Sequence, residues 1–518
     1  MILAVLVLGI MTVFVARLFY LQILQHDQYV SQANREQVKR WVIPSKRGII
    51  YAMDGASAVP VVMNENVYAV TADPQVITKP DKVINVVREI AGGNARANLS
   101  EKLAMKESRY QILATKLSRK QAELIKEKKL TGIRLVETSQ RVYPEGSLAA
   151  QTLGFVNAED KGQYGVEGQL NSRLLGKDGM LKSVADVSNV PLTIGSQNIN
   201  IPARNGDNIV LTIDRNVQSS SEKLLAAGMK KSGATNGSVI VMDPQTGKVM
   251  AMANLPTYNP GEYNKVQDAA AFNNSVVTSP YEPGSDIKTL MVAMGIDKNV
   301  IAPESTYNNT DYIKVEDRTI TNATKGQTGI ITMQHALNFS LNTGMVTIAQ
   351  RLGDGNTITR QARDTMYQYY HDRFGFGEMT GIEVAGEQPG IVIPPTAAEG
   401  NAVRYSNMAF GQGMDLTMIQ VAAGFSSIIN GGTYYQPTII NGTMGDDEVT
   451  FVPATPKAPR TDVITPASSN TVRAMVHEAR TKFYAASERP GLTLGGKTGT
   501  SQTIENGKYV DNQTFGTY

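Results

Sequence analysis

The chain has 518 residues, roughly enough for two large domains or three to four smaller ones. Hydrophobic residues make up 42% and charged residues 19%, which excludes a globally disordered or collagen-like chain. The net charge of +3 is too close to neutral to indicate nucleic-acid binding. Cysteine is absent, which excludes disulfides, thiolate metal sites, iron–sulfur clusters and cysteine nucleophiles. The four histidines are too widely spread for a short metal-binding motif.

A long apolar segment stands at the N-terminus. Residues 1–16 carry no charge, Arg17 interrupts the run, and LFYLQIL continues it to Leu24. About 20 apolar residues can span a bilayer as a helix, and an arginine can extend its charge to the interface. A cleaved signal peptide is the alternative, but no small-residue cleavage site follows the segment. We therefore expect residues 1–24 to form an uncleaved transmembrane anchor.

Two different patterns follow the anchor. Residues 25–205 mix strand-like and helical segments, including the strand-like WVIPSKRGIIYAMDG and a charged helix, SRKQAELIKEKKLTG, which Gly132 is expected to end. The pattern changes near residue 206. A strand (DNIVLTI), an amphipathic helix (VQSSSEKLLAAGMKK) and a hairpin with its turn at residues 243–247 come next. We predict a domain boundary near residue 206, then a mainly helical region in which strand signals return only near Gly495.

Lysine is the obvious base for a serine nucleophile in a chain without cysteine and with few histidines. The pattern Ser-x-x-Lys, which places both side chains on one helix face, occurs at Ser220/Lys223 and Ser285/Lys288. The first pair lies in the polar amphipathic helix and is interpreted as surface. The second follows the turn-forming Tyr-Glu-Pro-Gly and opens an apolar helix. Ser285 should therefore lie at a helix N-terminus, where free N–H groups favour negative charge, with Lys288 one turn further, where burial would lower its pKa.

Two further motifs follow the Ser285 pair. Ser340-Leu341-Asn342 lies between two helical patterns, but the same pattern occurs at residues 196–198 and 468–470. Taken alone, it is better explained as a polar turn between helices. The only Lys-Thr-Gly is at Lys497-Thr498-Gly499, followed by Thr500. Residues 491–498 also match the phosphate-loop pattern, which requires a helix after the lysine. Glycine, β-branched residues and a turn follow instead, so we predict a strand and hairpin here and no nucleotide site.

In this order, the motifs resemble the Ser-x-x-Lys, Ser-x-Asn and Lys-Thr-Gly set of penicillin-recognising acyl-serine enzymes. The whole chain resembles class B penicillin-binding proteins, the monofunctional peptidoglycan transpeptidases, and the division type more than the elongation type. Outside the motifs, the resemblance rests on RLFYLQI, PYEPGSDIK, RGII at residue 47, RVYP at residue 141, GVE at residue 165 and GQG at residue 411. It implies an α/β (α+β) fold with a transmembrane helix and a mixed pedestal or dimerisation domain over residues 25–205. Residues 206–518 would form a penicillin-binding transpeptidase domain with a central antiparallel sheet flanked by helices.

The resemblance also implies an activity and a role for each motif residue. The protein would be a single-pass membrane D,D-transpeptidase of cell-wall synthesis with an extracytoplasmic catalytic domain, acylated by D-Ala-D-Ala peptides and by β-lactams. The roles would be nucleophile for Ser285, base for Lys288, proton relay for Ser340 and orientation of the donor for Asn342. The Lys497–Thr500 segment, with Thr498 and Gly499, would bind the donor, and the N–H groups of Ser285 and Thr500 would form the oxyanion hole. No metal, organic cofactor or nucleic acid is expected. The partners would be a polytopic glycosyltransferase and division or elongation proteins.

Two alternatives to the transpeptidase stay open. In a D,D-carboxypeptidase, water would replace the acceptor amine; a non-catalytic scaffold or β-lactam sensor would not turn over. Departures from the family pattern bear on these alternatives. Ala52 stands where an aspartate is usual, and Asp286 stands where an uncharged residue is usual, so its charge could repel the substrate carboxylate or hold Lys288 protonated. The chain ends 18 residues after Thr500, from which we expect a truncated product that lacks a C-terminal strand and helix.

Overall fold

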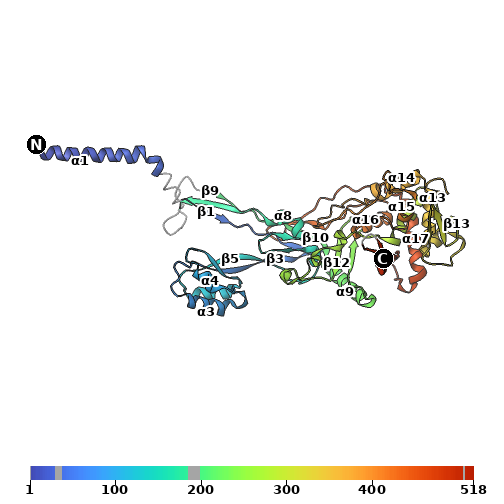
Figure 1. Ribbon diagram of the computed structural model, residues 1–518, viewed down its shortest axis with the longest axis horizontal. Coiled ribbons are helices and arrows are strands. Elements are labelled where there is room, and N and C mark those ends of the chain that lie inside the picture. Colours follow the sequence, from blue (N-terminus) through green and yellow to red (C-terminus); the bar gives the residue numbers. More distant parts are fainter. Residues whose placement is uncertain (1, 30–37, 185–198, 506–507) are drawn as a thin grey trace. The chain divides into compact units, whose positions relative to one another are not determined.

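The computed structural model describes residues 2–29, 38–184, 199–505 and 508–518 (Figure 1). The chain divides into two compact units. The first combines Met1–Gly48 with Ser172–Asp207, and the second combines Ile49–Asn171 with Asn208–Tyr518. The domain boundary near residue 206 that the sequence suggests stays a prediction.

The first unit holds the apolar helix and a small sheet. Helix α1 (Ile2–Phe19) continues into a π-helical turn, η1 (Tyr20–Leu24). The stretch Val5–Leu24 is long and apolar enough to cross a membrane, and none of it is buried in the protein. Arg17 lies 5.5 Å from the centre of the Tyr20 ring, a cation–π contact next to the interruption that the sequence shows. Strands β1 (Val38–Ile43), β8 (Gly179–Val184) and β9 (Ile199–Ile201) form an antiparallel sheet in the order β1-β8-β9.

A seven-stranded mixed sheet runs through the second unit. Its order is β18-β17-β10-β2-β3-β4, and β5 also pairs with β3. The strands are β2 (Ile50–Asp54), β3 (Ser57–Ala72), β4 (Gln111–Leu117), β5 (Ile133–Val142), β10 (Asn208–Asp214), β17 (Ile440–Met444) and β18 (Phe451–Pro453). The predicted strand NIVLTI is β10, which is buried along almost its whole length between parallel β2 and antiparallel β17. Burial on both faces explains why this strand is continuously apolar instead of alternating.

Three helices cover β3, β4 and β5 with their own small core. They are α3 (Pro80–Ala91), α4 (Leu99–Ala104) and α5 (Arg119–Glu127), and Val87, Leu99 and Ile125 are among their buried contacts (Figure 1). Helix α5 begins with a capping box formed by Ser118 and Gln121. It ends at Glu127, before the predicted stop at Gly132, and Lys129 takes a left-handed conformation with φ 44° just after it.

The first elements after β10 are those that the sequence predicts. The amphipathic helix is α9 (Arg215–Ser232), and it packs on the predicted hairpin of β11 (Gly237–Met242) and β12 (Val249–Leu255). The turn closes with a bond from the Gly247 N–H to the Asp243 carbonyl. Before β10, short elements lie along residues 150–175: α6 (Ala150–Leu153), β6 (Phe155–Val156), β7 (Gly162–Gln163), α7 (Gly165–Gln169) and α8 (Asn171–Leu175).

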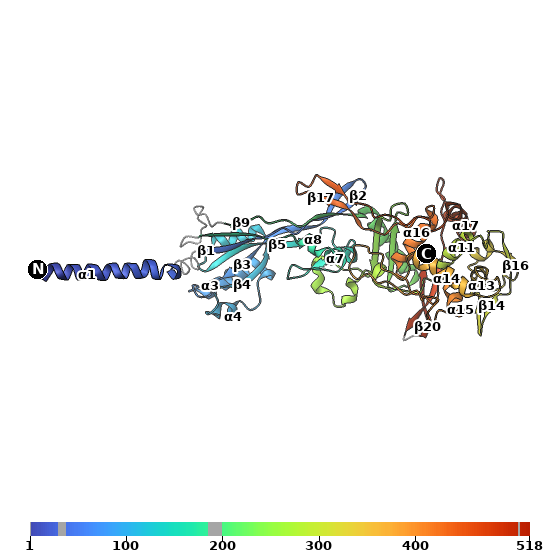
Figure 2. The same cartoon turned by 90° about the horizontal axis from the view of Figure 1, so that it is seen from above.

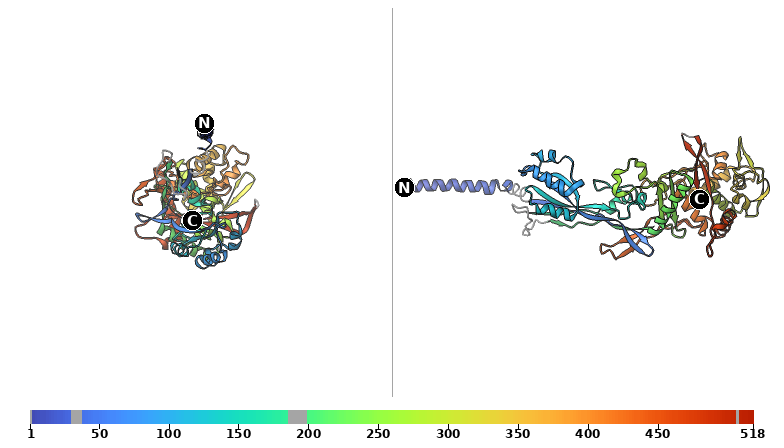
Figure 3. Two further views of the ribbon diagram at one scale, coloured as in Figure 1. Left: turned by 90° about the vertical axis from the view of Figure 1, so that its left-hand side faces the viewer. Right: turned by 90° about the horizontal axis from the view of Figure 1, so that it is seen from below.

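A largely helical region follows, built around α11 (Ile287–Asp297), whose residues from Ile287 to Gly295 are all buried. The surrounding α-helices are α10 (Ser275–Thr278), α12 (Met333–Asn338), α13 (Asn342–Arg351), α14 (Arg360–Tyr367), α15 (Ala402–Met408), α16 (Met418–Ile429) and α17 (Pro466–Tyr484). Single 3-10 or π turns are η3 (Pro260–Lys265), η4 (Ala269–Phe272), η6 (Gln368–Arg373) and η7 (Ala485–Ser487). The hairpin of β19 (Gly499–Glu505) and β20 (Lys508–Thr517) projects from this region, and the C-terminus lies among the helices at its base (Figure 2, Figure 3).

The prediction that strands return only near Gly495 is wrong. Four short strands lie between α11 and α12, namely β13 (Thr306–Asn309), β14 (Tyr312–Val315), β15 (Arg318–Thr321) and β16 (Gly329–Thr332). They pair as β13–β16 and β14–β15, and β17 and β18 follow later in the chain. Strands of four residues, with Asn, Asp and Gly in and between them, are too short to show the alternation of apolar and polar residues that predicts a strand. The mixed α/β class is confirmed. In the described residues, β13–β16, β14–β15 and β19–β20 form separate antiparallel pairs, whereas β17 and β18 belong to the mixed sheet.

Candidate active site

Ser285 lies at the N-terminal end of α11, as its sequence context predicts. Residues Gly284–Asp286 form a 3-10 turn, η5, that leads directly into the helix. Gly284 has φ 62°, and a Cβ at this position would lie 2.8 Å from the Thr500 carbonyl oxygen. Its N–H donates to the Gly411 carbonyl at 2.9 Å. Because glycine tolerates both the positive φ and the close approach, the turn brings Ser285 next to the first strand of the hairpin, β19.

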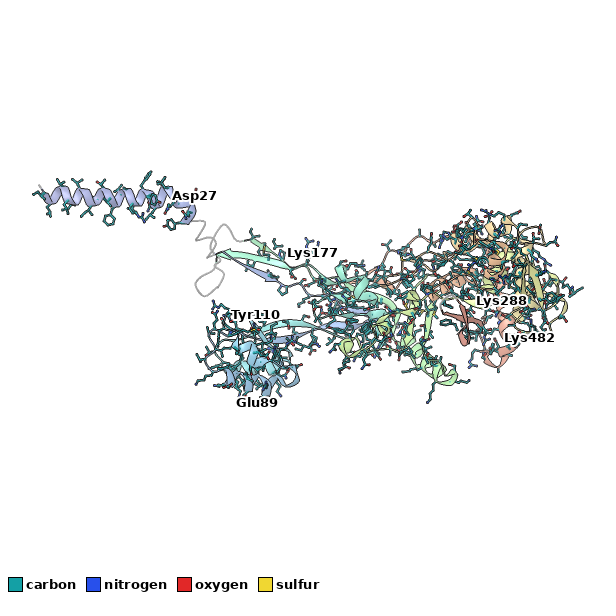
Figure 4. All side chains as sticks on the ribbon, viewed as in Figure 1. Asp27, Glu89, Tyr110, Lys177, Lys288 and Lys482 are labelled. Atoms are coloured by element: carbon teal, nitrogen blue, oxygen red, sulfur yellow. The ribbon has the colours of Figure 1, made fainter. Side chains whose placement is uncertain are left out.

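Lys288 is the second residue of α11 and lies within the helical region (Figure 4). It is almost fully buried, with 1% of its surface exposed. Its Nζ donates to the Ser340 carbonyl at 2.5 Å, to Asn342 Oδ1 at 2.7 Å and to Ser340 Oγ at 3.2 Å. Burial and the nearby Lys497 ammonium hold the pKa of Lys288 well below its usual value. Both effects penalise the charged form, so the environment favours a neutral amine that can accept a proton.

Ser340 and Asn342 occupy the turn between α12 and α13. Ser340 takes a left-handed conformation with φ 56°, and Asn342 is the first residue of α13. The Asn342 side chain is held at both ends, because its Oδ1 accepts from Lys288 and its Nδ2 donates to the Thr321 carbonyl at 2.9 Å. The interhelical turn and the Ser-x-Asn motif are thus the same segment.

Lys497 lies two residues before β19, and its ammonium group points to the same serine. Its Nζ donates to Ser340 Oγ at 2.9 Å and to the Thr498 carbonyl at 2.7 Å. Burial lowers the pKa of Lys497 to about 8, and the Asp286 carboxylate opposes this effect. Ser340 Oγ is therefore within hydrogen-bond distance of two lysine nitrogens from different elements. Along the strand, Thr498 and Thr500 are exposed and Gly499 is buried.

Asp286 is buried under the hairpin, with 7% of its surface exposed. A Cβ on Gly499 would lie 2.8 Å from Asp286 Oδ1 and 2.0 Å from Thr517 Oγ1, so both oxygens face that glycine. Burial raises the pKa of Asp286 to about 6, against the Thr517 hydroxyl and the Lys497 ammonium, which lower it. Its Oδ1 has no hydrogen bond of ordinary geometry among the described residues. Of the two lysines, Asp286 thus acts on the pKa of Lys497. The lowered pKa of Lys288 is explained by burial and by the Lys497 ammonium.

The structure also describes most of the competing patterns. Ser220 and Lys223 are both exposed on α9, as predicted. Thr498 is followed by a strand, which contradicts the phosphate-loop interpretation, because that loop leads into a helix. Residues 468–470 lie inside α17, and the pattern at residues 196–198 lies outside the described residues. Sequence reasoning missed Thr321 and its neighbour Asn322, which contact the motif from 21 residues away.

Comparisons with known proteins match both parts of the chain. The model of the penicillin binding protein transpeptidase domain matches residues 237–518, and that of the penicillin-binding protein dimerisation domain matches residues 42–211. Stage V sporulation protein D of Bacillus subtilis (strain 168) is 27% identical over 505 residues, which cover 96% of this chain and 75% of that protein. Peptidoglycan D,D-transpeptidase FtsI of Escherichia coli (strain K12) is 26% identical over 431 residues, 81% of this chain and 68% of that protein.

The fold has a solved counterpart. The crystal structure of penicillin binding protein 2X from Streptococcus thermophilus superposes with a TM-score of 0.73 at 23% identity, covering 92% of this chain and 74% of that one. At this identity, the likeness is one of fold.

Proposed function

The chain belongs to the penicillin-binding proteins that carry a transpeptidase domain, and we propose that it cross-links peptidoglycan stem peptides as a membrane-anchored D,D-transpeptidase. The proposal rests on one observation: side chains from three segments of the chain come together at the Ser340 hydroxyl group. Lys288 of α11 and Lys497 before β19 both reach Ser340 Oγ, at 3.2 Å and 2.9 Å. A proton can therefore pass between the two lysines through Ser340.

In the acylation step, neutral Lys288 takes the proton from Ser285 Oγ, which attacks the penultimate carbonyl of a peptide ending in D-Ala-D-Ala. The low pKa of Lys288 supports this role. The N–H groups of Ser285 and Thr500 stabilise the oxyanion, which fits the close approach of the Gly284 turn to Thr500. Ser340 then passes a proton from Lys288 to the departing D-alanine. A neighbouring stem-peptide amine attacks the acyl-enzyme and frees Ser285.

The donor peptide binds along the start of β19. Lys497, largely protonated at neutral pH with a pKa of about 8, attracts the terminal carboxylate together with the exposed hydroxyl groups of Thr498 and Thr500. Gly499 lets the strand pack closely on Asp286 and Thr517, and the peptide adds to the strand through main-chain hydrogen bonds. Asn342 orients the donor while its Oδ1 holds Lys288. β-Lactams acylate Ser285 by the same route.

The segments outside the site support a position of the protein at the membrane. The apolar helix over residues 1–24 anchors the protein as a single span, with residues 206–518 as the catalytic domain on the extracytoplasmic side. Residues 25–205 form the non-catalytic pedestal. A polytopic glycosyltransferase that makes glycan strands and proteins of division or elongation are the partners that this arrangement serves.

The activity is tested on the full chain in detergent, with a pentapeptide that ends in D-Ala-D-Ala and an acceptor amine. We expect release of D-alanine together with the cross-linked product, both lost in Ser285→Ala. Ser220→Ala is the matched control, because it removes the serine of the other Ser-x-x-Lys, and it should leave both products unchanged. D-alanine release without a cross-linked product would indicate a carboxypeptidase. No release by the folded protein would contradict the proposal.

A further inference from the structure

The helix that carries Asn342 lacks a cap of its own. The residue before α13 is Leu341, whose side chain cannot accept a hydrogen bond from the first turn. The N–H groups of a helix's first turn need acceptors, which Ser, Thr, Asp or Asn usually provide from the N-cap position. Here the acceptor comes from elsewhere, because Asn322 Oδ1 accepts from the Thr343 N–H at 3.0 Å. Asn322 directly follows β15, so the short-strand region caps α13 from outside.

A buried network holds Asn322 in this position. Asn322 and Asn309 are each 1% exposed, and the Asn322 amide donates to Asn309 Oδ1 at 3.1 Å. Thr343 Oγ1 lies 2.9 Å from Asn309 Oδ1 and 3.1 Å from Asn322 Oδ1. The Asn309 amide in turn donates to the Gln327 carbonyl at 2.6 Å. A buried amide network whose members are all hydrogen-bonded is rigid, because moving one member leaves its partners unpaired.

The same segment reaches the catalytic residues. Thr321, the neighbour of Asn322, accepts from Asn342 Nδ2 at 2.9 Å, and Asn342 Oδ1 accepts from Lys288 at 2.7 Å. Thr321 and Asn322 thus hold the first two residues of α13, one through a main-chain carbonyl and one through a side-chain carbonyl. Any shift of this segment changes where the Asn342 amide meets the Lys288 amine.

We propose that Asn322 is a positioning residue for acylation of Ser285, which caps α13 from the end of β15 and so holds Asn342 against Lys288. The inference rests on the proposed function, because it concerns the same reaction. Asn322 touches neither substrate nor nucleophile, so its effect is on the rate of the chemical step. Binding of the donor carboxylate depends on Lys497 and Thr498, which belong to another segment, and should not change.

The test measures acylation of the full chain in detergent by a fluorescent penicillin over a range of concentrations. The data give k2, the rate constant of acylation, and K, the dissociation constant of the complex before acylation. In Asn322→Ala, k2 should fall about 10- to 100-fold, the size of loss expected when a catalytic group is displaced by about 1 Å. K should stay within about twofold, since uniform binding is untouched. Asn322→Asp keeps the acceptor oxygen but loses the amide that donates to Asn309 Oδ1 and Asp311 Oδ1, so it should restore only part of k2. Asn322→Gln displaces the amide by one methylene and should restore none.

Asn208→Ala is the matched control. Asn208 is also buried, and its Oδ1 also accepts a main-chain N–H from a distant segment, that of Ile49 at 2.8 Å. It lies on β10, and its replacement should lower the melting temperature without changing k2. An unchanged k2 in Asn322→Ala would overturn the proposal, and so would an equal loss of k2 in the Asn208 variant. If Asn322→Ala does not fold, equal k2 values in the Asp and Gln variants would overturn it. Failure of the unmodified chain to be acylated would instead contradict the proposed function.

Discussion

Replacing Asp286 by asparagine should stabilise the protein at neutral and alkaline pH. The carboxyl group is buried beside the hairpin, and burial raises its pKa from 3.8 to about 6 even with the Lys497 ammonium nearby. An ionised Asp286 is therefore a cost to the folded state. An asparagine of nearly the same shape keeps the contacts and removes the charge.

The pKa gives both the size and the sign of this effect. A rise from 3.8 to about 6 corresponds to about 3 kcal/mol, at 1.36 kcal/mol per tenfold change in proton affinity. Between these two pH values the folded protein keeps a proton that the unfolded chain has released. Stability therefore falls as the pH rises through this window, and the full cost is present above about pH 6. Asp286→Asn should gain up to about 3 kcal/mol at pH 7 to 8 and little near pH 4.

Urea denaturation in detergent, followed by circular dichroism at several pH values, measures this difference. Asp297→Asn is the matched control. Asp297 is also buried, but it accepts hydrogen bonds from the Thr465 N–H at 2.7 Å and from Ser468 Oγ at 3.1 Å, so its replacement should destabilise the protein. Equal stability of Asp286→Asn and the unmodified chain at pH 8, or a difference that does not change with pH, would refute the reasoning.

Two further predictions concern the shared hydroxyl and a buried ion pair. Ser340→Ala removes the acceptor that Lys288 and Lys497 share, and hydrogen bonds to charged groups contribute about 1.5–3 kcal/mol. Acylation by penicillin should slow at least about tenfold; an unchanged rate constant would exclude the relay. Glu167→Gln takes the carboxylate from Arg141, with which it pairs at 2.7 Å in full burial. Urea denaturation should show a loss of about 3–5 kcal/mol, with the acylation rate of folded molecules unchanged; unaltered stability would contradict this.

Local chemistry explains which parts of the site the sequence predicts. A Tyr-Glu-Pro-Gly turn before an apolar stripe is enough to place Ser285 at a helix start and Lys288 inside it. A strand after Thr498 follows from glycine and β-branched residues. Both interpretations need only residues within one turn or strand of the motif, and the structure agrees with both.

Contacts across long sequence separations could not be predicted. The cap on α13 joins residues 21 apart and depends on short strands that the sequence does not reveal. Nothing in the sequence around Asn322 therefore indicates that it contacts α13. For the same reason, the sequence could not predict which group the Asp286 charge affects. Its neighbour in sequence is Ser285, the proposed nucleophile, but its charge acts on Lys497, which the fold brings to it from the other end of the domain.

Covalent labelling tests the central claim most directly. The full chain is treated with a fluorescent penicillin, digested, and analysed by mass spectrometry for the modified peptide. We predict a single adduct on Ser285, absent in Ser285→Ala and still present in Ser220→Ala. No adduct on the folded chain, or an adduct on another residue that persists in Ser285→Ala, would contradict the assignment of Ser285 as the nucleophile.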